Sequence, residues 1–306
     1  MKKKIIFILM LAGASVNAQV EPLFSQYYIS EFLVNPAISG NKSYNSINIQ
    51  TRKQWLGFEG APITTNVFGH GSLDDRSAMG AYLMFDKLGP VLQANTQINY
   101  AYHIPLDYDR VNLSFGIGAK LIYYSIDFNK EDLPPTFDPA FSAKNESQTS
   151  GDASAGAYLY GRNFHIGYSI SNLFQSNFKS SLNENFPNQL FRNYYTIAAY
   201  RFSIINNDIL LEPSFLVRKH HTSKSITDLT TRIIYLDDYW TGLTYRTEGA
   251  GVFSFGFKIN NMLITYSYDH SFSNEIMQYA YGTHEIGLGF RINTNATKRH
   301  ISFWDY

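Results

Sequence analysis

The chain has 306 residues, of which 25 are basic and 25 acidic, and it contains no cysteine. The neutral balance gives no reason to expect a nucleic-acid partner, and the lack of cysteine excludes disulfides and thiolate chemistry. Charged and aromatic residues each make up 16%, and beyond the N-terminus no apolar run reaches the roughly 18 residues that a membrane helix needs. This composition is typical of a transmembrane β-barrel, with a soluble all-β protein as the alternative.

Residues 1–18 have the pattern of a secretory signal peptide. Three lysines, Lys2 to Lys4, precede an apolar core of about ten residues, and Val16-Asn17-Ala18 precedes Gln19. The apolar core is too short to span a bilayer, and no cysteine follows the expected cleavage site. We therefore expect the chain to be exported across a bacterial inner membrane and not to become a lipoprotein.

Residues 19–43 form a segment in which neither a strand period nor a helix period is visible. Its central part, Phe24–Gly40, reads FSQYYISEFLVNPAISG. Asn35-Pro36 favours an extended or turned backbone over a continuing helix. Gln26 and Asn35 need polar partners, which a wet lumen offers and lipid does not. We expect this segment at the periplasmic mouth or in the lumen of a barrel, where it would cap the lumen or present a docking surface.

The rest of the chain is dominated by alternation of apolar and polar residues, broken by Asn, Asp and Gly. In 111–121, for example, Phe115, Ile117 and Leu121 share one face while Ser114 and Lys120 share the other. Such strands place one side against lipid and the other against an aqueous lumen. We expect an antiparallel barrel over 44–292 with about fourteen strands, an even number as in bacterial barrels. Their predicted ranges are 44–55, 63–72, 77–86, 91–104, 110–127, 150–160, 163–173, 192–204, 208–219, 225–236, 239–246, 251–259, 262–271 and 283–292.

The connections between these strands alternate in length. Short polar turns follow the even strands, at 74–76, 161–163, 206–208, 237–238 and 260–261, and longer loops follow several odd strands, at 129–150, 172–191 and 271–281. Barrels with short periplasmic turns and long outer loops show this asymmetry, which predicts that both termini lie in the periplasm. Residues 293–306 form a tail that is compatible with a periplasmic tail, a lumen insert or an extra strand edge.

Charges of both signs occur at positions expected to face the lumen. They are Arg52, Lys120, Asp152, Arg201, Glu212, Arg218, Asp228, Arg232, Arg246, Lys258, Asp269, Glu285 and Arg291. An ion-selective pore more often shows one sign at its constriction, so mixed signs favour a charge-paired, largely closed lumen.

The aromatic residues Trp55, Tyr239, Trp240 and Tyr245 have the pattern of a belt at the membrane–water interface.

No catalytic or metal-binding motif is visible in the chain. His220 and His221 are adjacent, so on a strand they would point to opposite sides and could not ligate one metal. His103, His165 and His284 are expected to face the lumen. No zinc-protease, EF-hand, phosphate-loop or hydrolase-elbow pattern occurs. We expect neither an enzyme nor a cofactor or metal site.

Several blocks within 24–121 resemble the PorP/SprF family of type IX secretion proteins from Bacteroidetes. FSQYY…LVNPAISG in 24–40, RKQW…GAP-x-T in 52–64 and MFDKLGP in 84–90, followed by NYAYHI in 99–104, match that family's ordered blocks. Phe85 stands where the family has a polar residue. The candidate docking residues carried by these motifs are Phe24, Ser25, Gln26, Tyr27, Asn35, Pro36, Gly40, Arg52, Trp55, Pro62, Asp86, Lys87, Gly89 and Pro90.

The resemblance implies an outer-membrane component of type IX secretion and, in gliding bacteria, of adhesin export for gliding motility. It implies protein partners: the C-terminal domain of a secreted adhesin-like substrate, and periplasmic and outer-membrane components of the secretion machinery, with outer-membrane lipid around the barrel. The alternative is an outer-membrane channel or transporter for hydrophobic or small polar solutes, which an N-terminal plug would also suit.

Overall fold

The computed structural model describes residues 22, 24–107, 110–127, 146–178, 188–205, 208–220, 224–272 and 280–292. The predicted signal peptide, most of the predicted loop 129–150 and the tail 293–306 lie outside these residues.

The described residues are almost entirely antiparallel strands, as the alternating pattern predicts. The barrel strands are β1 (Asn45–Lys53), β2 (Ile63–Ser72), β3 (Ser77–Leu88), β4 (Val91–Pro105), β5 (Val111–Ile126), β6 (Glu146–Gly161), β7 (Phe164–Ser171), β10 (Asn193–Tyr200), β12 (Ile209–His220), β13 (Ile226–Tyr235), β14 (Tyr239–Arg246), β15 (Ala250–Ile259), β16 (Met262–Ser271) and β17 (Thr283–Ile292). The short strand β11 (Phe202–Ile205) continues β10 after a break at Arg201, so the predicted strand 192–204 is made of two pieces.

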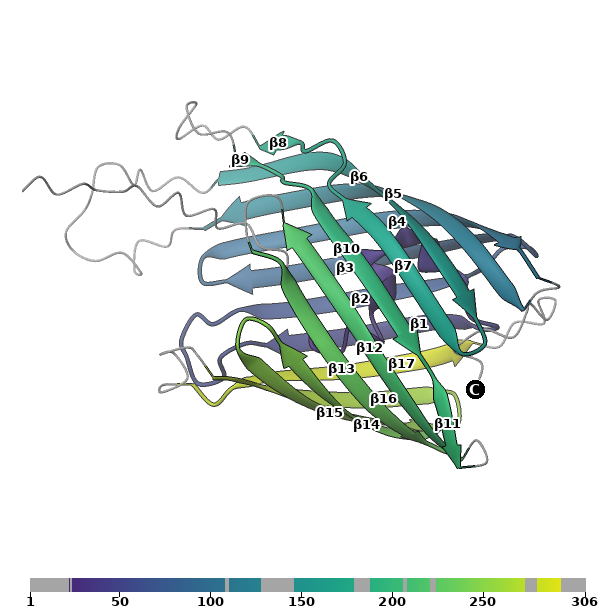
Figure 1. Cartoon of the computed structure of the whole chain (residues 1–306). Coiled ribbons are helices and arrows are strands. Elements are labelled where there is room, and N and C mark those ends of the chain that lie inside the picture. Colours follow the sequence, from purple (N-terminus) through teal and green to yellow (C-terminus); the bar gives the residue numbers. More distant parts are fainter. Residues whose placement is uncertain are drawn as a thin grey trace, which may run out of the picture.

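These strands close into a ring (Figure 1). Consecutive barrel strands pair with each other, β10 pairs with β7 and β12, and β1 pairs with β17 from Asn45↔Ile292 to Lys53↔His284. The described residues thus form a closed barrel of 14 strands, and the predicted fold class is confirmed. Within the predicted loop 172–191 a small hairpin of β8 (Asn177–Phe178) and β9 (Asn188–Gln189) forms, which the sequence analysis missed.

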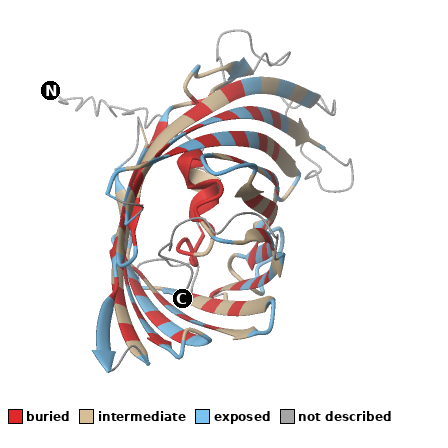
Figure 2. Cartoon of the chain, turned by 90° about the vertical axis from the view of Figure 1, so that its right-hand side faces the viewer, coloured by how far each residue is buried: buried red, intermediate tan, exposed pale blue. Residues whose placement is uncertain are grey.

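Side chains alternate between the lumen and the outer surface along each strand. In β5, Phe115, Ile117 and Leu121 are exposed by 51%, 64% and 54%, whereas Ser114 and Lys120 are buried. Figure 2 shows the same banding around the ring. In water, so large an exposed apolar surface would promote aggregation. In a membrane barrel it faces the hydrocarbon of the bilayer.

The predicted orientations of Trp240 and His284 are wrong. In each case the neighbouring residue on the strand faces the side that was predicted for it, so the residue itself faces the other side. Tyr239 is 55% exposed, so its neighbour Trp240 faces the lumen and is only 8% exposed; it is not part of an interface belt. Glu285 is fully buried in the lumen, so His284 lies on the outer face, where its Nδ1 is 2.7 Å from the hydroxyl of Tyr266.

The two ends of the barrel differ. The short-turn end carries the turns between β2 and β3, β6 and β7, β11 and β12, β13 and β14, and β15 and β16, and β17 finishes there (Figure 1). At the opposite end, which we call the long-loop end, β1, β5, β7 and β16 finish, and the strands that follow them in the barrel (β2, β6, β10 and β17) begin. Among the described residues, no helix is long and apolar enough to cross a membrane.

The two short helices of the chain lie inside the ring. They are α1 (Glu31–Val34) and the 3₁₀ helix η1 (Pro36–Ile38), and Figure 2 shows them surrounded by the strands. The chain then passes through Asn41 into β1 at the short-turn end.

Candidate functional site

The luminal segment, residues 24–41, fills the middle of the barrel. Nearly all of its side chains are buried, including the polar Ser25, Gln26, Asn35 and Asn41. Its first polar contacts are with β16 and β17 near the long-loop end, and its last are with β2 and β4 near the short-turn end. The segment therefore runs along the lumen axis and contacts strands on opposite sides of the ring.

The carboxylate of Glu285 holds the beginning of the luminal segment. It accepts hydrogen bonds from the backbone N–H of Ser25 at 2.9 Å and of Gln26 at 3.1 Å, and from Nε2 of Gln50 on β1 at 2.5 Å. The side-chain amide of Gln26 also donates to the backbone carbonyl of Glu285. Because Glu285 is fully buried, these donors and the guanidinium of Arg52 at 3.5 Å are what make burial of its charge tolerable.

A chain of ion pairs continues from this point across the lumen wall. Arg52 pairs with Asp269 at 2.9 Å, Asp269 with Arg246 at 3.4 Å, and Arg246 with Asp228 at 2.8 Å. Asp228 also pairs with Arg218 at 2.6 Å. The hydroxyl of Ser25 donates to Asp269 at 2.5 Å, so the family-motif residues Ser25 and Arg52 meet in this network. Of the thirteen charged residues predicted to face the lumen, nine form ion pairs in this network or in the cluster around Glu212, which agrees with the charge-paired lumen that their mixed signs favour.

A second charge cluster supports the middle of the luminal segment nearer the short-turn end. Glu212 pairs with both Arg201, at 2.8 Å, and Arg232. The guanidinium carbon of Arg232 lies 4.1 Å from the ring centre of Tyr28, a distance typical of a cation–π contact. Tyr28 also packs edge-on against Trp240 at 5.2 Å, and its hydroxyl donates to Ser254.

Apolar side chains fix the segment against two sides of the ring. Phe24, Phe32 and Ile38 pack with residues of β2, β3 and β6, and Tyr27 and Tyr28 pack with residues of β10, β12, β13 and β14. The hydroxyl of Tyr27 lies 2.9 Å from that of Ser214 on β12. Each buried aromatic side chain of this kind contributes a few kcal/mol to the free energy of folding. The segment is therefore a packed part of the barrel core.

Asn35 and Pro36 set the bend between the two helices. Asn35 is extended, which ends α1, and its side-chain oxygen accepts from the backbone N–H of Ala37 at 3.0 Å to cap η1. Its amide nitrogen donates to the backbone carbonyl of Ala157 on β6. Pro36 occupies the first position of η1, where a missing N–H costs nothing. The Asn-Pro pair therefore shapes the bend and ties it to the wall.

The end of the luminal segment is anchored by two histidines of the wall. The backbone N–H of Gly40 donates to Nδ1 of His70 at 3.0 Å, and the backbone carbonyl of Ser39 lies 2.8 Å from Nε2 of His103. Gly40 has φ +68°, and a Cβ there would lie 2.3 Å from the Cβ of Ala78. Both the backbone conformation and the space require glycine at this position.

Substitution of Gly116 tests how tightly η1 is seated. A Cβ at Gly116 of β5 would lie 2.3 Å from the backbone N of Ala37, whereas a Cβ at Gly151 of β6 meets nothing closer than 3.9 Å. We expect Gly116→Val to weaken seating of the segment by about 1–3 kcal/mol, an overpacking cost. In a Ser39→Cys background, labelling of the thiol would then rise roughly 10- to 100-fold. Gly151→Val is the matched control and should leave the rate unchanged; equal rates in both variants would contradict a tight seat.

The remaining motif residues lie away from the luminal segment, at the rim of the long-loop end. Trp55 and Pro62 belong to the β1–β2 connection, Asp86 and Lys87 to the end of β3, and Gly89 and Pro90 to the β3–β4 turn. The backbone N–H of Gly89 donates to the carbonyl of Gly60 at 3.1 Å, which joins the two motif blocks. Asp86 accepts from the hydroxyl of Thr64 at 2.5 Å.

The fourteen motif residues thus separate into a luminal group and a rim group. The luminal group is Phe24, Ser25, Gln26, Tyr27, Asn35, Pro36, Gly40 and Arg52. Sequence reasoning missed Tyr28, Glu285 and Asp269 as contacts of the segment, although Tyr28 lies within the same motif and both acids were expected to face the lumen. Within the described ranges, no group of three His, Asp or Glu residues could hold a metal ion.

A closed antiparallel barrel with an apolar outer face and a segment of its own chain packed in the lumen is a membrane barrel of the outer-membrane type. The chain belongs to the family of type IX secretion system membrane proteins PorP/SprF, whose model matches residues 16–290. It is therefore an outer-membrane component of type IX secretion.

Solved structures agree with this fold. The chain is similar to the toluene transporter TbuX of Ralstonia pickettii (TM-score 0.52, 11% identity, 86% of this chain and 94% of that chain covered). It is also similar to a deltaS2 mutant of the monoaromatic hydrocarbon channel TodX (TM-score 0.50, 10% identity, 87% and 94% covered). At these identities the likeness concerns the fold alone. No curated protein matches the chain.

Proposed function

We propose that this barrel acts in type IX secretion by binding proteins and does not conduct solutes. Its long-loop end would receive the C-terminal domain of a secreted adhesin-like substrate, and its short-turn end would face the periplasmic machinery. The candidate contacts are the long loops 129–150 and 172–191 together with the rim motif around Gly60 and Gly89.

The observation that carries this proposal is the packing of the luminal segment. A barrel of this size encloses more space than its own wall side chains fill. Here that space is taken by residues 24–41, which are hydrogen-bonded to both sides of the ring and backed by paired charges. A lumen filled in this way supports a role for the barrel's ends and loops, not for its interior.

The rival function is a channel or transporter for hydrophobic or small polar solutes. It has some support from the fold, because TbuX is a transporter and TodX a channel. For solute to pass, however, the luminal segment would have to give up buried ion-pair and hydrogen-bond partners, each of which costs about 1–3 kcal/mol or more to leave unsatisfied.

Deletion of the gene separates the two functions. We expect the mutant to lose a surface adhesin while the uptake of small solutes stays normal. The secreted C-terminal domain should copurify with the barrel from detergent extracts, and a barrel carrying the Gly60→Val and Gly89→Val changes at the rim should recover less of it. Normal adhesin display together with impaired solute uptake would sink the proposal and favour the channel.

A further inference from the structure

A row of outward-facing side chains lies where β17, β1, β2 and β3 meet the long-loop end. The strand register places side by side His284, Lys53, Ile63 and Lys87. Two strand spacings put the backbones of Lys53 and Lys87 roughly 10 Å apart, with Ile63 between them. Both lysine side chains are exposed, and neither is paired with a carboxylate among the described residues. Asp86, next to Lys87, turns to the lumen side and accepts from the hydroxyl of a buried threonine.

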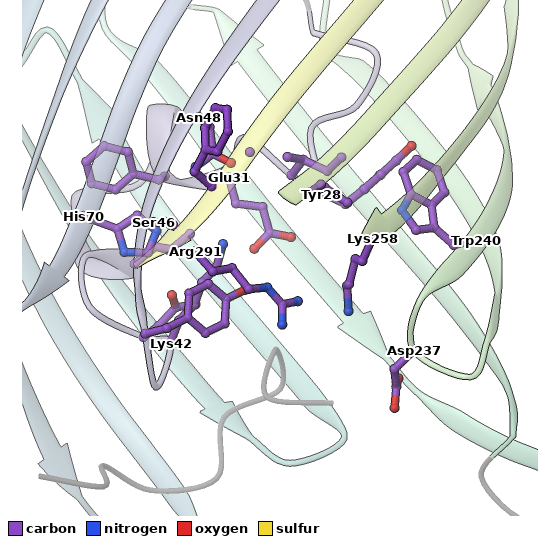
Figure 3. A pocket seen from close by; sticks show the side chains of 18 of the residues that line it. Tyr28, Glu31, Lys42, Ser46, Asn48, His70, Asp237, Trp240, Lys258 and Arg291 are labelled. Atoms are coloured by element: carbon purple, nitrogen blue, oxygen red, sulfur yellow. The ribbon is translucent and has the colours of Figure 1, made fainter. Parts of the chain in front are cut away.

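The outer face of the same four strands carries no charge at the short-turn end. The corresponding row there consists of Ile292, Asn45, Gly71 and Met79. Cations near that end line the mouth of the lumen instead, as Figure 3 shows for Lys42, Lys258 and Arg291. The outer surface of these strands therefore presents cations at one end only.

Apolar side chains follow the lysine row toward the middle of the barrel. Phe85, two residues before Lys87, and Ile286, two residues after His284, are large and exposed on the outer face. A surface of this kind meets the acyl chains of the bilayer. Lys53 and Lys87 therefore lie at the level where the head groups of membrane lipids begin.

An open hollow connects the two lysines with the aqueous side of the rim. Its lining includes Lys53, Lys87, Glu59 and Asp127, so two carboxylates accompany the two ammonium groups. Both acids lie beyond the row, because Glu59 belongs to the β1–β2 connection and Asp127 follows the end of β5. From the bilayer outward, the order of groups is therefore apolar wall, ammonium groups and carboxylates.

This order complements a phosphorylated glycolipid. Its acyl chains would lie on the apolar wall, and its phosphate would accept charge-assisted hydrogen bonds from both lysines, whose flexible stems let them converge on one anion. Its sugar hydroxyls would donate to the carboxylates, which accept hydrogen bonds only. A phospholipid without a sugar would offer these carboxylates far fewer donors.

We propose that Lys53 and Lys87 bind the phosphate of a glycolipid in the outer leaflet of the outer membrane, with Glu59 and Asp127 on its sugar hydroxyls. The inference rests on the proposed function only for the orientation of the barrel, with the long-loop end outward. Lipid binding is measured without a secreted substrate, so failure of this test leaves the copurification test of the proposed function unaffected.

The test titrates the full barrel in a neutral detergent with diphosphoryl lipid A and measures bound lipid by native mass spectrometry. We expect saturable binding, and weaker binding of dephosphorylated lipid A and of phosphatidylglycerol. Each of Lys53→Gln and Lys87→Gln should weaken lipid A binding about fivefold, and the double variant about 25-fold, since a lysine near an anionic lipid surface contributes ~1 kcal/mol. Binding of dephosphorylated lipid A should stay the same in all three variants.

Two further variants serve as controls. Lys219→Gln removes the same charge from an exposed lysine near the end of β12, on another part of the ring, and should leave lipid A affinity unchanged. The charge-preserving double variant Lys53→Arg with Lys87→Arg should retain the binding. Equal binding of phosphorylated and dephosphorylated lipid A, phosphatidylglycerol binding as tight as that of lipid A, or unchanged affinity in the double glutamine variant would overturn the proposal.

Discussion

Replacement of Glu285 by alanine is expected to release the beginning of the luminal segment. The carboxylate accepts from the backbone N–H groups of Ser25 and Gln26 and from the side chain of Gln50, and it lies near Arg52. Without this carboxylate, the three buried N–H donors have no acceptor, and Arg52 loses one of its two acidic neighbours. Loss of one partner from a buried ion pair costs about 3–5 kcal/mol.

The chain contains no cysteine, so release can be measured by labelling of a single introduced thiol. Ser30→Cys is a small change at a buried position of the segment. In the Glu285→Ala background, the labelling rate of this thiol should rise by two to three orders of magnitude, since 1.4 kcal/mol corresponds to about a tenfold change in an equilibrium constant. The barrel itself should still close, because its strand pairing is unaffected.

Glu59→Ala serves as the matched control, because it removes a carboxylate from an exposed position in the β1–β2 connection. In the Glu59→Ala background, the Ser30→Cys thiol should be labelled at the same rate as in the chain that carries Ser30→Cys alone. If Glu285→Ala labels no faster than Glu59→Ala, the hydrogen bonds to Glu285 do not hold the segment in place.

Deletion of residues 24–40 is expected to convert a closed barrel into an open one. A barrel of 14 strands lies between the eight-stranded barrels whose side chains fill the interior and the porins of about 16–18 strands that leave an aqueous channel. Without the luminal segment, water would fill the lumen and hydrate its polar wall, which includes Asn48, Asn66, Asn95 and Asn99. We expect stable ion conductance from the deletion variant in planar bilayers and little or none from the full chain.

A second variant separates loss of the segment from loss of its contacts. Replacing 24–40 by a Gly/Ser linker of the same length keeps a tether in the lumen but none of the anchoring side chains, and it should conduct as well. Secretion of the adhesin by the same two variants then shows whether the segment is needed for function. A full chain with large, stable conductance would contradict the closed lumen.

The sequence by itself determined the barrel and much of its wall. Alternation in β4 and β5 named the lipid-facing and lumen-facing residues correctly, and alternating connection lengths identified two different ends. These signals are local, because a strand puts successive side chains on opposite faces whatever its partners are. The same rule explains the two wrong orientations. Trp240 is adjacent to Tyr239, and His284 is adjacent to Glu285, so the two members of each pair could not lie on one face.

Only the tertiary structure decided where the luminal segment lies and which wall residues it contacts. Its sequence showed an absence of period and a bend at Asn35-Pro36, but not that Ser25 would meet Asp269 and Glu285 from strands at the other end of the chain. It also could not show why Gly116 must lack a side chain, since the obstacle is the backbone of Ala37. Such contacts join residues separated by up to 260 positions, and they exist only once the ring has closed around the segment.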